Sequence, residues 1–331
     1  MKILVTGGAG YIGSHMNLVL QDAGHAVTVF DNLSRGFNDA VKGATLIEGD
    51  LRSPDDLDRL FKFNPFDLVM HFAALTYVDE SVKNPHLYFA NNVVGTLNLL
   101  SAMENHGLNK LVFSSSCAVY GEPIQVPITE SHPRSPISPY GENKLAVEEE
   151  LLDATKKGLK SISLRYFNAA GADKNLRAGE RHDPETHLIP LVLMEALRIK
   201  KGGDARDTKL KVFGKDFDTK DGSPVRDYIH VEDLCHAHMA AAQRLTNNLV
   251  EGNEAYNLGN GKGFSVLEVI DAARRVTKQN ITYREMPRRE GDPAKLIGDA
   301  SLAKSELHWT PQYKDLGDII ETAWQYMLKI N

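Results

Sequence analysis

Short apolar runs alternate with longer amphipathic stretches through the first half of the chain. The apolar runs have the length and composition of buried strands, and we predict six of them: Ile3–Val5, Val27–Phe30, Thr45–Ile47, Leu68–Phe72, Leu111–Ser114 and Ile162–Arg165. Helix-like stretches lie between them, near 12–22, 54–62, 86–106 and 141–157. This alternation predicts an α/β fold in which a doubly wound parallel sheet carries helices on both faces.

The pattern changes after about residue 170. Polar and charged stretches occur at 171–186, 200–207 and 214–224. They separate helix-like segments at about 188–199 and 231–246. We interpret the polar stretches as loops of a smaller mixed α/β domain that covers a ligand site, with solvated surface as the alternative. The predicted division is a Rossmann domain over 1–170 and a substrate-binding domain over 171–331, with some later segments returning to the first domain.

Composition and charge narrow the class of protein. The 331 residues include 38 Lys and Arg and 44 Asp and Glu, a formal net charge of −6, whereas a dedicated nucleic-acid binder usually carries a basic face. No apolar run approaches the roughly 18 residues of a membrane span, and the first residues lack a secretory pattern. Cys117 and Cys235 are too few for a disulfide framework. We therefore expect a cytoplasmic protein with no nucleic-acid or membrane partner.

A glycine-rich turn follows the first predicted strand in the string LVTGGAGYIGSH. Gly7 allows the tight turn, Gly10 lets the backbone approach a pyrophosphate, and Gly13 lets the following helix pack on the strand. The start of that helix offers free N–H groups to phosphates. Asp31 ends the second strand and is placed to accept ribose hydroxyls, while Asp50 follows the third strand on the adenine side. A carboxylate at Asp31 would repel a 2′-phosphate, so the predicted cofactor is NAD.

A second group of residues indicates chemistry on an alcohol. Three serines end the fifth predicted strand at Ser116, and Tyr140 precedes Lys144 by four residues, so the phenol and the ammonium share one helix face. An ammonium about 6 Å away, at an effective dielectric of about 20, would lower the tyrosine pKa by roughly two units, toward the working range of a general base. The Tyr-x-x-x-Lys spacing is weak by itself and gains weight from the glycines and serines. The predicted reaction is oxidation of an alcohol with hydride transfer to NAD.

Longer strings carry a family resemblance over essentially the whole chain. The chain resembles the extended short-chain dehydrogenase/reductase family, and within it the UDP-sugar 4-epimerases, at TGGAGYIGSH, FDNLS, HFAA, NNVVGT, FSSSCAVYG, PYGENK, RYFNAAGA, PETHLIP, VRDYIHVEDL, YNLGNG and RREGDPA. The resemblance implies Tyr140 as base, Lys144 as its activator and Ser116 as hydroxyl partner. It implies an NAD site formed by Gly7, Gly10, Tyr11, Ile12, Gly13, Asp31, Asn32, Asp50, Leu51, Phe72, Ala73, Asn91, Lys144 and Phe167. It implies a UDP-sugar site formed by Ser116, Tyr140, Asn168, Leu188, Val212, Phe213, Arg226, Arg289 and Asp292.

The activity implied by the resemblance is interconversion of UDP-galactose and UDP-glucose at C4 through a transient 4-keto sugar. Two positions depart from the family pattern. Thr76 stands where better-known bacterial relatives have a lysine, and Leu296 stands where some members have a tyrosine. The smaller Leu296 leaves room for a C2 acetamido group, so interconversion of UDP-GlcNAc and UDP-GalNAc, alone or in addition, is an alternative.

Other activities fit the residues less well. Dehydratases and decarboxylases of this family carry acidic residues after the serine run, where this chain has Cys117 and Ala118. A non-catalytic NAD-binding protein often loses the tyrosine and lysine that are retained here. We expect no metal: in DYIHVEDLCHAH, which holds His230 and Cys235, His236 and His238 point about 200° apart on a helix and form no facing pair. The resemblance further suggests a homodimer formed through helices of the first domain, such as 86–106.

Overall fold

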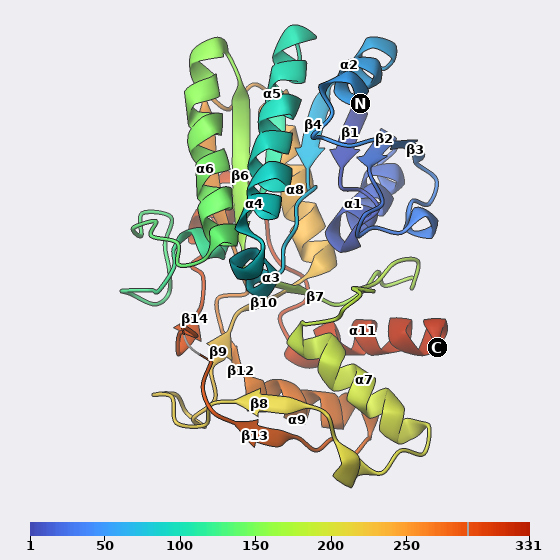
Figure 1. Cartoon of the computed structure of the whole chain (residues 1–331), viewed down its shortest axis with the longest axis vertical. Coiled ribbons are helices and arrows are strands. Elements are labelled where there is room, and N and C mark those ends of the chain that lie inside the picture. The colour runs from blue at the N-terminus through green and yellow to red at the C-terminus, as the bar shows by residue number, and fades with distance from the viewer. Residues whose placement is uncertain (290) are drawn as a thin grey trace.

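A sheet of seven parallel strands forms the centre of the computed structural model, which describes residues 1–289 and 291–331 (Figure 1). The strands are β1 (Lys2–Thr6), β2 (Ala26–Asp31), β3 (Thr45–Glu48), β4 (Leu68–His71), β5 (Lys110–Ser116), β6 (Lys160–Tyr166) and β11 (Asn253–Leu258). Their spatial order is β11-β6-β5-β4-β1-β2-β3, so the winding reverses between β1 and β4. Ligands of doubly wound sheets bind at the carboxyl ends of the strands beside this reversal. The predicted fold class is confirmed, and all six predicted strands are present.

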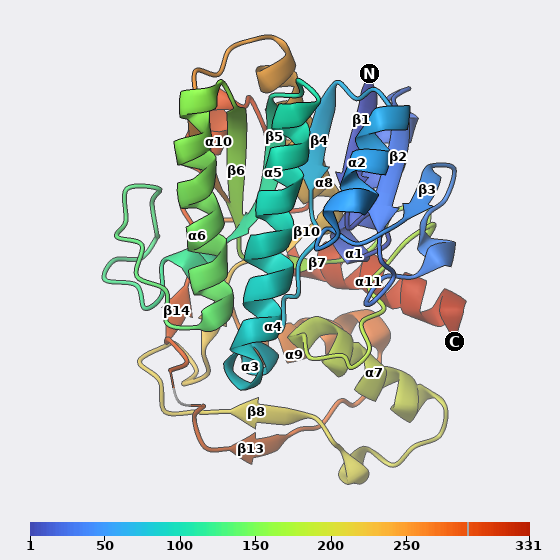
Figure 2. The same cartoon turned by 45° about the horizontal axis from the view of Figure 1, so that its top comes forward.

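Helices cover both faces of this sheet (Figure 2). One face carries α2 (Pro54–Phe63), α5 (Gly95–Asn105) and α6 (Pro139–Ala154), and the other carries α1 (Tyr11–Asp22) and α8 (Val231–Thr246). Within β1, Leu4 packs into the first of these layers, and Ile3 and Val5 pack into the second. Because both faces are buried, the strand reads as a continuous apolar run rather than an alternating one.

The connection between β4 and β5 differs from the single helix predicted over 86–106. It consists of α3 (Val78–Lys83), α4 (Pro85–Phe89), a π-helical stretch (Ala90–Val94) and α5. Inside the π-helical stretch, the amide of Asn92 accepts from the backbone N–H of Leu75 at 2.8 Å and donates to its carbonyl at 2.9 Å. This contact ties the helix to the loop after β4. It also presents the preceding residue, Asn91, to the cavity described below.

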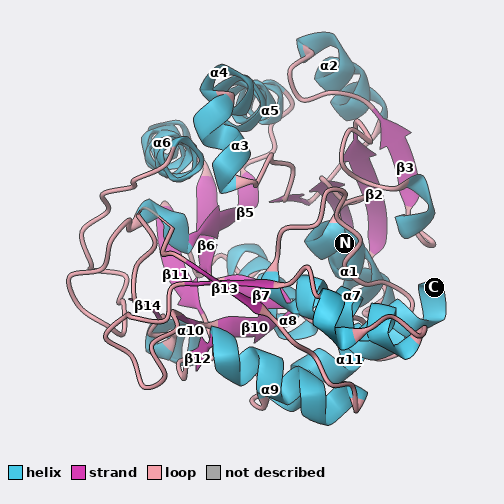
Figure 3. Cartoon of the chain, turned by 60° about the horizontal axis from the view of Figure 1, so that its bottom comes forward, coloured by secondary structure: helices cyan, strands magenta, loops and turns pink. Residues whose placement is uncertain are grey.

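The C-terminal part is built from short strands and three packed helices. Its strand pairings are β7 (Asn168–Ala170) with β10 (Tyr228–His230), β8 (Lys211–Phe213) with β13 (Arg284–Met286), and β9 (Val225–Arg226) with β12 (Phe264–Ser265) and β14 (Lys295–Leu296). Helices α7 (Leu188–Lys200), α9 (Val266–Thr277) and α11 (Leu316–Ile330) enclose a second core (Figure 3). Helix α10 (Ser301–Glu306) packs against β11, so α8, α10 and β11 all belong spatially to the large sheet.

Several short 3₁₀ helices complete the connections: Asn38–Ala40, Cys117–Val119, Thr155–Lys157 and Ala205–Asp207. Among the described residues, none of the helices combines the length and the apolar composition that crossing a membrane requires. The late strand β11, which follows most of the C-terminal part in sequence, was not predicted. It extends the sheet by pairing in parallel with β6 along its whole length, from Asn253 to Leu258.

Candidate active site

A cavity of about 1400 Å³ lies between the carboxyl ends of the sheet strands and the C-terminal part. This volume exceeds the roughly 300–1,000 Å³ of a typical single-ligand pocket, so two ligands can lie in it side by side. Of the residues predicted to bind cofactor or substrate, all but Val212 line it. Val212 is buried in the second core, whereas its neighbours Lys211 and Phe213 line the cavity. Side chains alternate along β8, so the side chain of Val212 points into the core, and a contact between Val212 and the substrate stays a prediction.

The turn after β1 is shaped for close backbone approach to a ligand. Gly7 has φ +74°, and a Cβ there would lie 2.4 Å from the backbone nitrogen of Ala73. A Cβ on Gly13 would lie 2.3 Å from the carbonyl oxygen of Gly7, so both positions exclude any side chain. A Cβ on Gly10 would meet one atom at 3.4 Å, which leaves the space beside it open. Gly10 precedes α1 and has no side chain to cap it, so the first N–H groups of the helix are free for phosphate oxygens.

Two carboxylates stand where the second and third strands end. Asp31 accepts from the backbone N–H groups of Ala9 at 3.0 Å and Leu33 at 2.9 Å, so it braces the glycine turn from the side. Burial raises the pKa of Asp31 despite these hydrogen bonds. Asp50 is paired with Arg52 at 2.6 Å, and hydrogen bonds from this guanidinium hold its pKa well below the usual range. Both carboxylates line the cavity, and their contacts with the ribose and adenine ends of a dinucleotide stay predictions.

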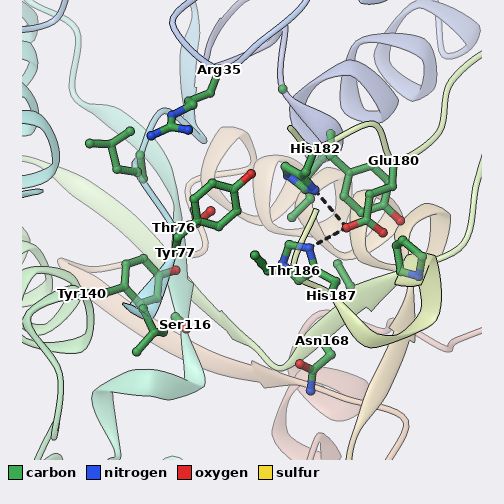
Figure 4. Close-up of a pocket in the computed structure, with 18 of the residues that line it drawn as sticks. Arg35, Thr76, Tyr77, Ser116, Tyr140, Asn168, Glu180, His182, Thr186 and His187 are labelled. Atoms are coloured by element: carbon green, nitrogen blue, oxygen red, sulfur yellow. Dashed lines mark hydrogen bonds and ion pairs between the residues drawn. The ribbon is translucent and has the colours of Figure 1, made fainter. Parts of the chain in front are cut away.

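The predicted base and its partners converge on one part of the cavity wall. The Ser138 hydroxyl caps α6 by accepting from the N–H of Gly141 at 3.2 Å, and this start brings Tyr140 to the end of β5. There both the phenol of Tyr140 and the hydroxyl of Ser116 line the cavity, and the proximity of Ser116 favours the charged form of the phenol. The Lys144 ammonium donates to the carbonyl of Ser114 at 2.6 Å and lies 5.9 Å from the centre of the Tyr140 ring, close to the separation expected. Figure 4 shows Tyr140 and Ser116 side by side at one side of the pocket.

The electrostatic state of this group differs from the expectation. Burial raises the pKa of Tyr140 to about 12, and the nearby Ser116 hydroxyl opposes this only in part. Burial also lowers the pKa of Lys144 to about 7, although the nearby Glu148 favours its charged form. Desolvation disfavours both charged forms, so the expected lowering of the Tyr140 pKa by the ammonium is absent from the protein alone. Additional positive charge in the cavity is therefore needed to favour the phenolate.

A buried ion-pair network behind this group escaped sequence reasoning. Glu148 lies one turn after Lys144 on α6 and binds the Arg165 guanidinium of β6 with both carboxylate oxygens, at 2.9 and 2.5 Å. It also accepts from the hydroxyl of Ser115 at 2.6 Å. These contacts fix α6 against the ends of two strands and so fix the position of the lysine. The signal in the sequence was an arginine at the end of an otherwise apolar strand.

The opposite wall carries the residues predicted to bind a nucleotide diphosphate. The Arg226 side chain pairs with Asp292, and the guanidinium of Arg289 lies 4.0 Å above the ring of Phe213. Asn168 donates to the carbonyl of Asp227 at 3.0 Å. Two arginines at one wall can bind diphosphate oxygens through paired donors.

Two positions that depart from the family pattern also line the cavity. Leu296 pairs with Arg226 between β14 and β9 and packs on a small cluster that contains Phe167. Thr76 is exposed in the loop that follows β4. Cys117 lines the cavity as well, but burial raises the pKa of its thiol to about 12, which disfavours the nucleophilic thiolate.

Two segments of the chain carry closely spaced histidines, and in only one of them do the side chains come together. His236 is exposed and His238 is fully buried on α8, so the string DYIHVEDLCHAH brings no ligand set together. Instead, one nitrogen or oxygen from each of four residues in another segment comes within 4.8 Å of the other three: Glu180, His182, Glu185 and His187. The spacing Glu-x-His-x-x-Glu-x-His within one polar loop was the overlooked signal, where no metal ligands were expected.

Comparison with known proteins agrees with this geometry. Residues 3–259 match the model of the NAD dependent epimerase/dehydratase family. The chain is 49% identical to a UDP-glucose 4-epimerase of Halalkalibacterium halodurans, across 98% of this chain and 95% of that protein. It resembles the crystal structure of a Brucella ovis UDP-glucose 4-epimerase in complex with NAD, with TM-score 0.92, 43% identity and 98% of each chain covered. It also resembles the Campylobacter jejuni UDP-Glc/GlcNAc 4-epimerase, with TM-score 0.83, 40% identity and 99% of each chain covered.

Proposed function

The chain belongs to the NAD dependent epimerase/dehydratase family and is an epimerase, and we propose that it interconverts UDP-galactose and UDP-glucose at C4 of the sugar. The observation that carries this proposal is the placement of Tyr140, Ser116 and Lys144 between the glycine turn and the arginine wall of one cavity. A sugar held by its nucleotide at the arginine wall would present its hydroxyl to the phenol.

The residues around the glycine turn fit NAD. The exclusion of side chains at Gly7 and Gly13 lets the backbone approach a pyrophosphate, and the start of α1 supplies N–H donors to it. When bound, NAD would supply a reversible hydride acceptor beside C4 of the sugar. Because each turnover restores the oxidised form, the cofactor is retained by the protein rather than exchanged.

The side chains of the protein hold and move the proton. The phenolate of Tyr140 takes the proton from the sugar 4-hydroxyl and, as the phenol, later returns it, while Ser116 orients that hydroxyl by hydrogen bonding. In its charged form, which burial disfavours, Lys144 would stabilise the Tyr140 phenolate, and its ammonium would bind a ribose hydroxyl of the cofactor. Since burial raises the Tyr140 pKa to about 12, the base functions only when the loaded cavity contains further positive charge.

The arginine wall binds the part of the substrate that does not react. Arg226 and Arg289 grip the diphosphate, and the ring of Phe213 lies beneath the Arg289 guanidinium. Because the affinity comes from the nucleotide, the sugar can turn about its diphosphate linkage without leaving the cavity. This turn exposes the opposite face of the 4-keto sugar to the returning hydride.

An isotope experiment tests the reaction. Purified protein is incubated with UDP-galactose in deuterated water without added NAD, and the product is examined by nuclear magnetic resonance. We expect UDP-glucose without deuterium at C4, because the transferred hydrogen never meets solvent. Deuterium at C4 would refute transient oxidation, and absence of turnover even with added NAD would refute the epimerase assignment.

A second substrate class is favoured by one side chain. Leu296 lines the cavity beside Arg226, where the ring of a tyrosine would narrow the space next to the sugar. We propose that the enzyme also interconverts UDP-GlcNAc and UDP-GalNAc. The Leu296→Tyr variant is expected to lose turnover of UDP-GalNAc while it retains turnover of UDP-galactose. Equal effects on the two substrates, or no wild-type turnover of UDP-GalNAc at millimolar concentration, would contradict this second activity.

Assembly and location remain predictions. We propose a cytoplasmic homodimer formed through helices of the first domain. Exposed apolar side chains on these helices support the dimer: Val82 on α3, Phe89 on α4 and Leu152 on α6. Sedimentation equilibrium is expected to give twice the mass of the chain, and Phe89→Asp is expected to shift the equilibrium toward the monomer.

A further inference from the structure

Four side chains from one loop converge beside the start of α1, away from the proposed base. Glu180, His182, Glu185 and His187 belong to the segment that leads into α7. Figure 4 shows Glu180, His182 and His187 together on the side of the pocket opposite Tyr140. Both carboxylate side chains are only 8% exposed. The catalytic scheme above uses none of the four residues.

The four side chains share their partner atoms closely. The Nδ1 atom of His187 lies 2.9 Å from Glu180 Oε1 and 2.8 Å from Glu185 Oε1, although one N–H can donate a well-aligned bond to only one of them. The same Glu180 oxygen lies 3.0 Å from Nδ1 of His182, whose nitrogen is 3.9 Å from Glu185 Oε2. Two buried carboxylates and two imidazole nitrogens therefore surround one point.

The separations bracket those around a small tetrahedral cation. Zinc bonds of about 2.0–2.1 Å to nitrogen and oxygen place tetrahedral ligands roughly 3.3–3.4 Å apart. The donor pairs given above span 2.8 to 3.9 Å on either side of this value. A divalent cation would also neutralise two carboxylates that are otherwise buried side by side.

We propose that Glu180, His182, Glu185 and His187 form a zinc site. Two imidazoles and two carboxylates suit zinc better than the oxygen-preferring calcium or magnesium. Four protein ligands close the coordination shell, which is typical of a structural rather than a catalytic zinc. The carboxylate of Glu185 is held in place by the backbone N–H groups of Thr186 at 2.7 Å and His187 at 2.8 Å, an outer-shell arrangement that orients a ligand.

The position of the site indicates what the zinc would stabilise. The loop that carries the ligands bridges the two halves of the molecule: Arg181 pairs with Asp39 at 2.7 Å, and Tyr77 donates to the carbonyl of Pro184 at 3.0 Å. The ring of Tyr11, at the start of α1, lies 6.0 Å from the ring of His182. Zinc would hold this loop against the entrance to the proposed cofactor site.

Metal counting tests the proposal without reference to activity. The full chain is stripped with a chelator, dialysed and titrated with zinc chloride against a chromophoric chelator, and bound zinc is counted by mass spectrometry after gel filtration. We expect one zinc per chain. Loss of His182 or His187 by substitution with alanine should lower the affinity by more than the 10- to 100-fold typical of outer-shell changes. The exposed His236 on α8 gives a matched control, because His236→Ala should bind as the wild type does.

Two further measurements separate loss of zinc binding from loss of folding and test whether zinc protects the loop. Glu180→Gln preserves the shape of the side chain and its contacts with the histidines, so it separates loss of metal from loss of folding, which circular dichroism checks. Trypsin should cut near Arg177 in the same loop more slowly in the zinc-loaded wild type than in the stripped protein. Wild-type chain that retains no zinc, or ligand variants that bind it as tightly as the wild type, would overturn the proposal and leave an ion-pair cluster.

Discussion

The two walls of the cavity are built in different ways. The wall beside the sheet consists of strand ends, a side-chain-free glycine turn and buried groups such as Tyr140 and Lys144, which are 9% and 3% exposed. The opposite wall consists of strands two or three residues long and of partly exposed arginines that pair with acidic or aromatic partners. In the proposed reaction, the long sheet would provide the rigidity that proton and hydride transfer require, and the short strands would provide a binding surface that tolerates a turning sugar.

The largest expected effect comes from removing the proposed base, which tests whether the chemical step depends on the sheet wall. Tyr140→Phe is expected to lower kcat by roughly 10²- to 10⁴-fold, the usual contribution of a general base. Binding of UDP, which uses the other wall, should stay at the wild-type level when measured by calorimetry. Tyr77→Phe is the control, because that tyrosine also lines the cavity but bonds a backbone carbonyl. Near-normal kcat in Tyr140→Phe would place the base elsewhere.

The rigidity of the sheet wall is tested by two glycines with the same backbone conformation. Gly7 and Gly24 have φ +74° and +78°, but no atom lies within 4 Å of a Cβ built on Gly24. Gly24→Ala should cost about 1–2 kcal/mol of unfolding free energy through its left-handed backbone. Gly7→Ala should cost about 1–3 kcal/mol more, because its Cβ collides with the backbone of Ala73. Urea denaturation measures both, and equal losses would show that the close packing of the turn has no energetic weight.

Substitutions in the arginine wall should change KM rather than kcat. Arg289→Ala removes charged hydrogen bonds worth about 1.5–3 kcal/mol, which corresponds to a rise in KM of roughly 10- to 100-fold. The adjacent Arg288 pairs with Asp216 and does not line the cavity, so Arg288→Ala should leave both constants near the wild-type values. Steady-state kinetics with UDP-galactose separates the two constants. A fall in kcat alone would show that this wall also takes part in the chemical step.

The remaining prediction concerns the pH dependence of stability behind the glycine turn. His71 is fully buried between the hydroxyls of Thr6 and Thr96, at 2.6 and 2.8 Å, and burial lowers its pKa to about 3. Between about pH 6.5 and 3 the unfolded chain binds a proton at this residue that the native state does not bind. Stability is therefore retained above this range and is lost as the pH falls through it, by at most about 1.4 kcal/mol per pH unit.

Substitution isolates this contribution. His71→Gln should flatten the pH dependence of the urea midpoint between pH 6.5 and 5, whereas substitution of the exposed His86 by glutamine should leave the slope unchanged. An unchanged slope in His71→Gln would show that the histidine is protonated in the native state.

Much of the sheet wall could be predicted from the chain, because its signals are local. Apolar runs, the glycine spacing and Asp31 each follow from what one strand or turn requires. The opposite wall depends on pairing between distant segments: β8 with β13, and β9 with β14. Short strands have too few residues to show the alternation of buried and exposed side chains. The sequence therefore could not indicate that the side chain of Val212 points into the core. The pKa values of Tyr140 and Lys144 could not be predicted for another reason. Burial in the folded chain affects them more than the attraction between the two side chains that their spacing suggests.

The seventh strand has a consequence for how the polypeptide is made. β11 supplies the edge of the large sheet from residues 253–258, beyond most of the segments that form the opposite wall. A nascent chain that has left the ribosome only as far as the serine-rich strand and its neighbour β6 therefore exposes an unpaired apolar margin, a known hazard for aggregation. Completion of the sheet must therefore await synthesis of residues 253–258, which supply its last strand.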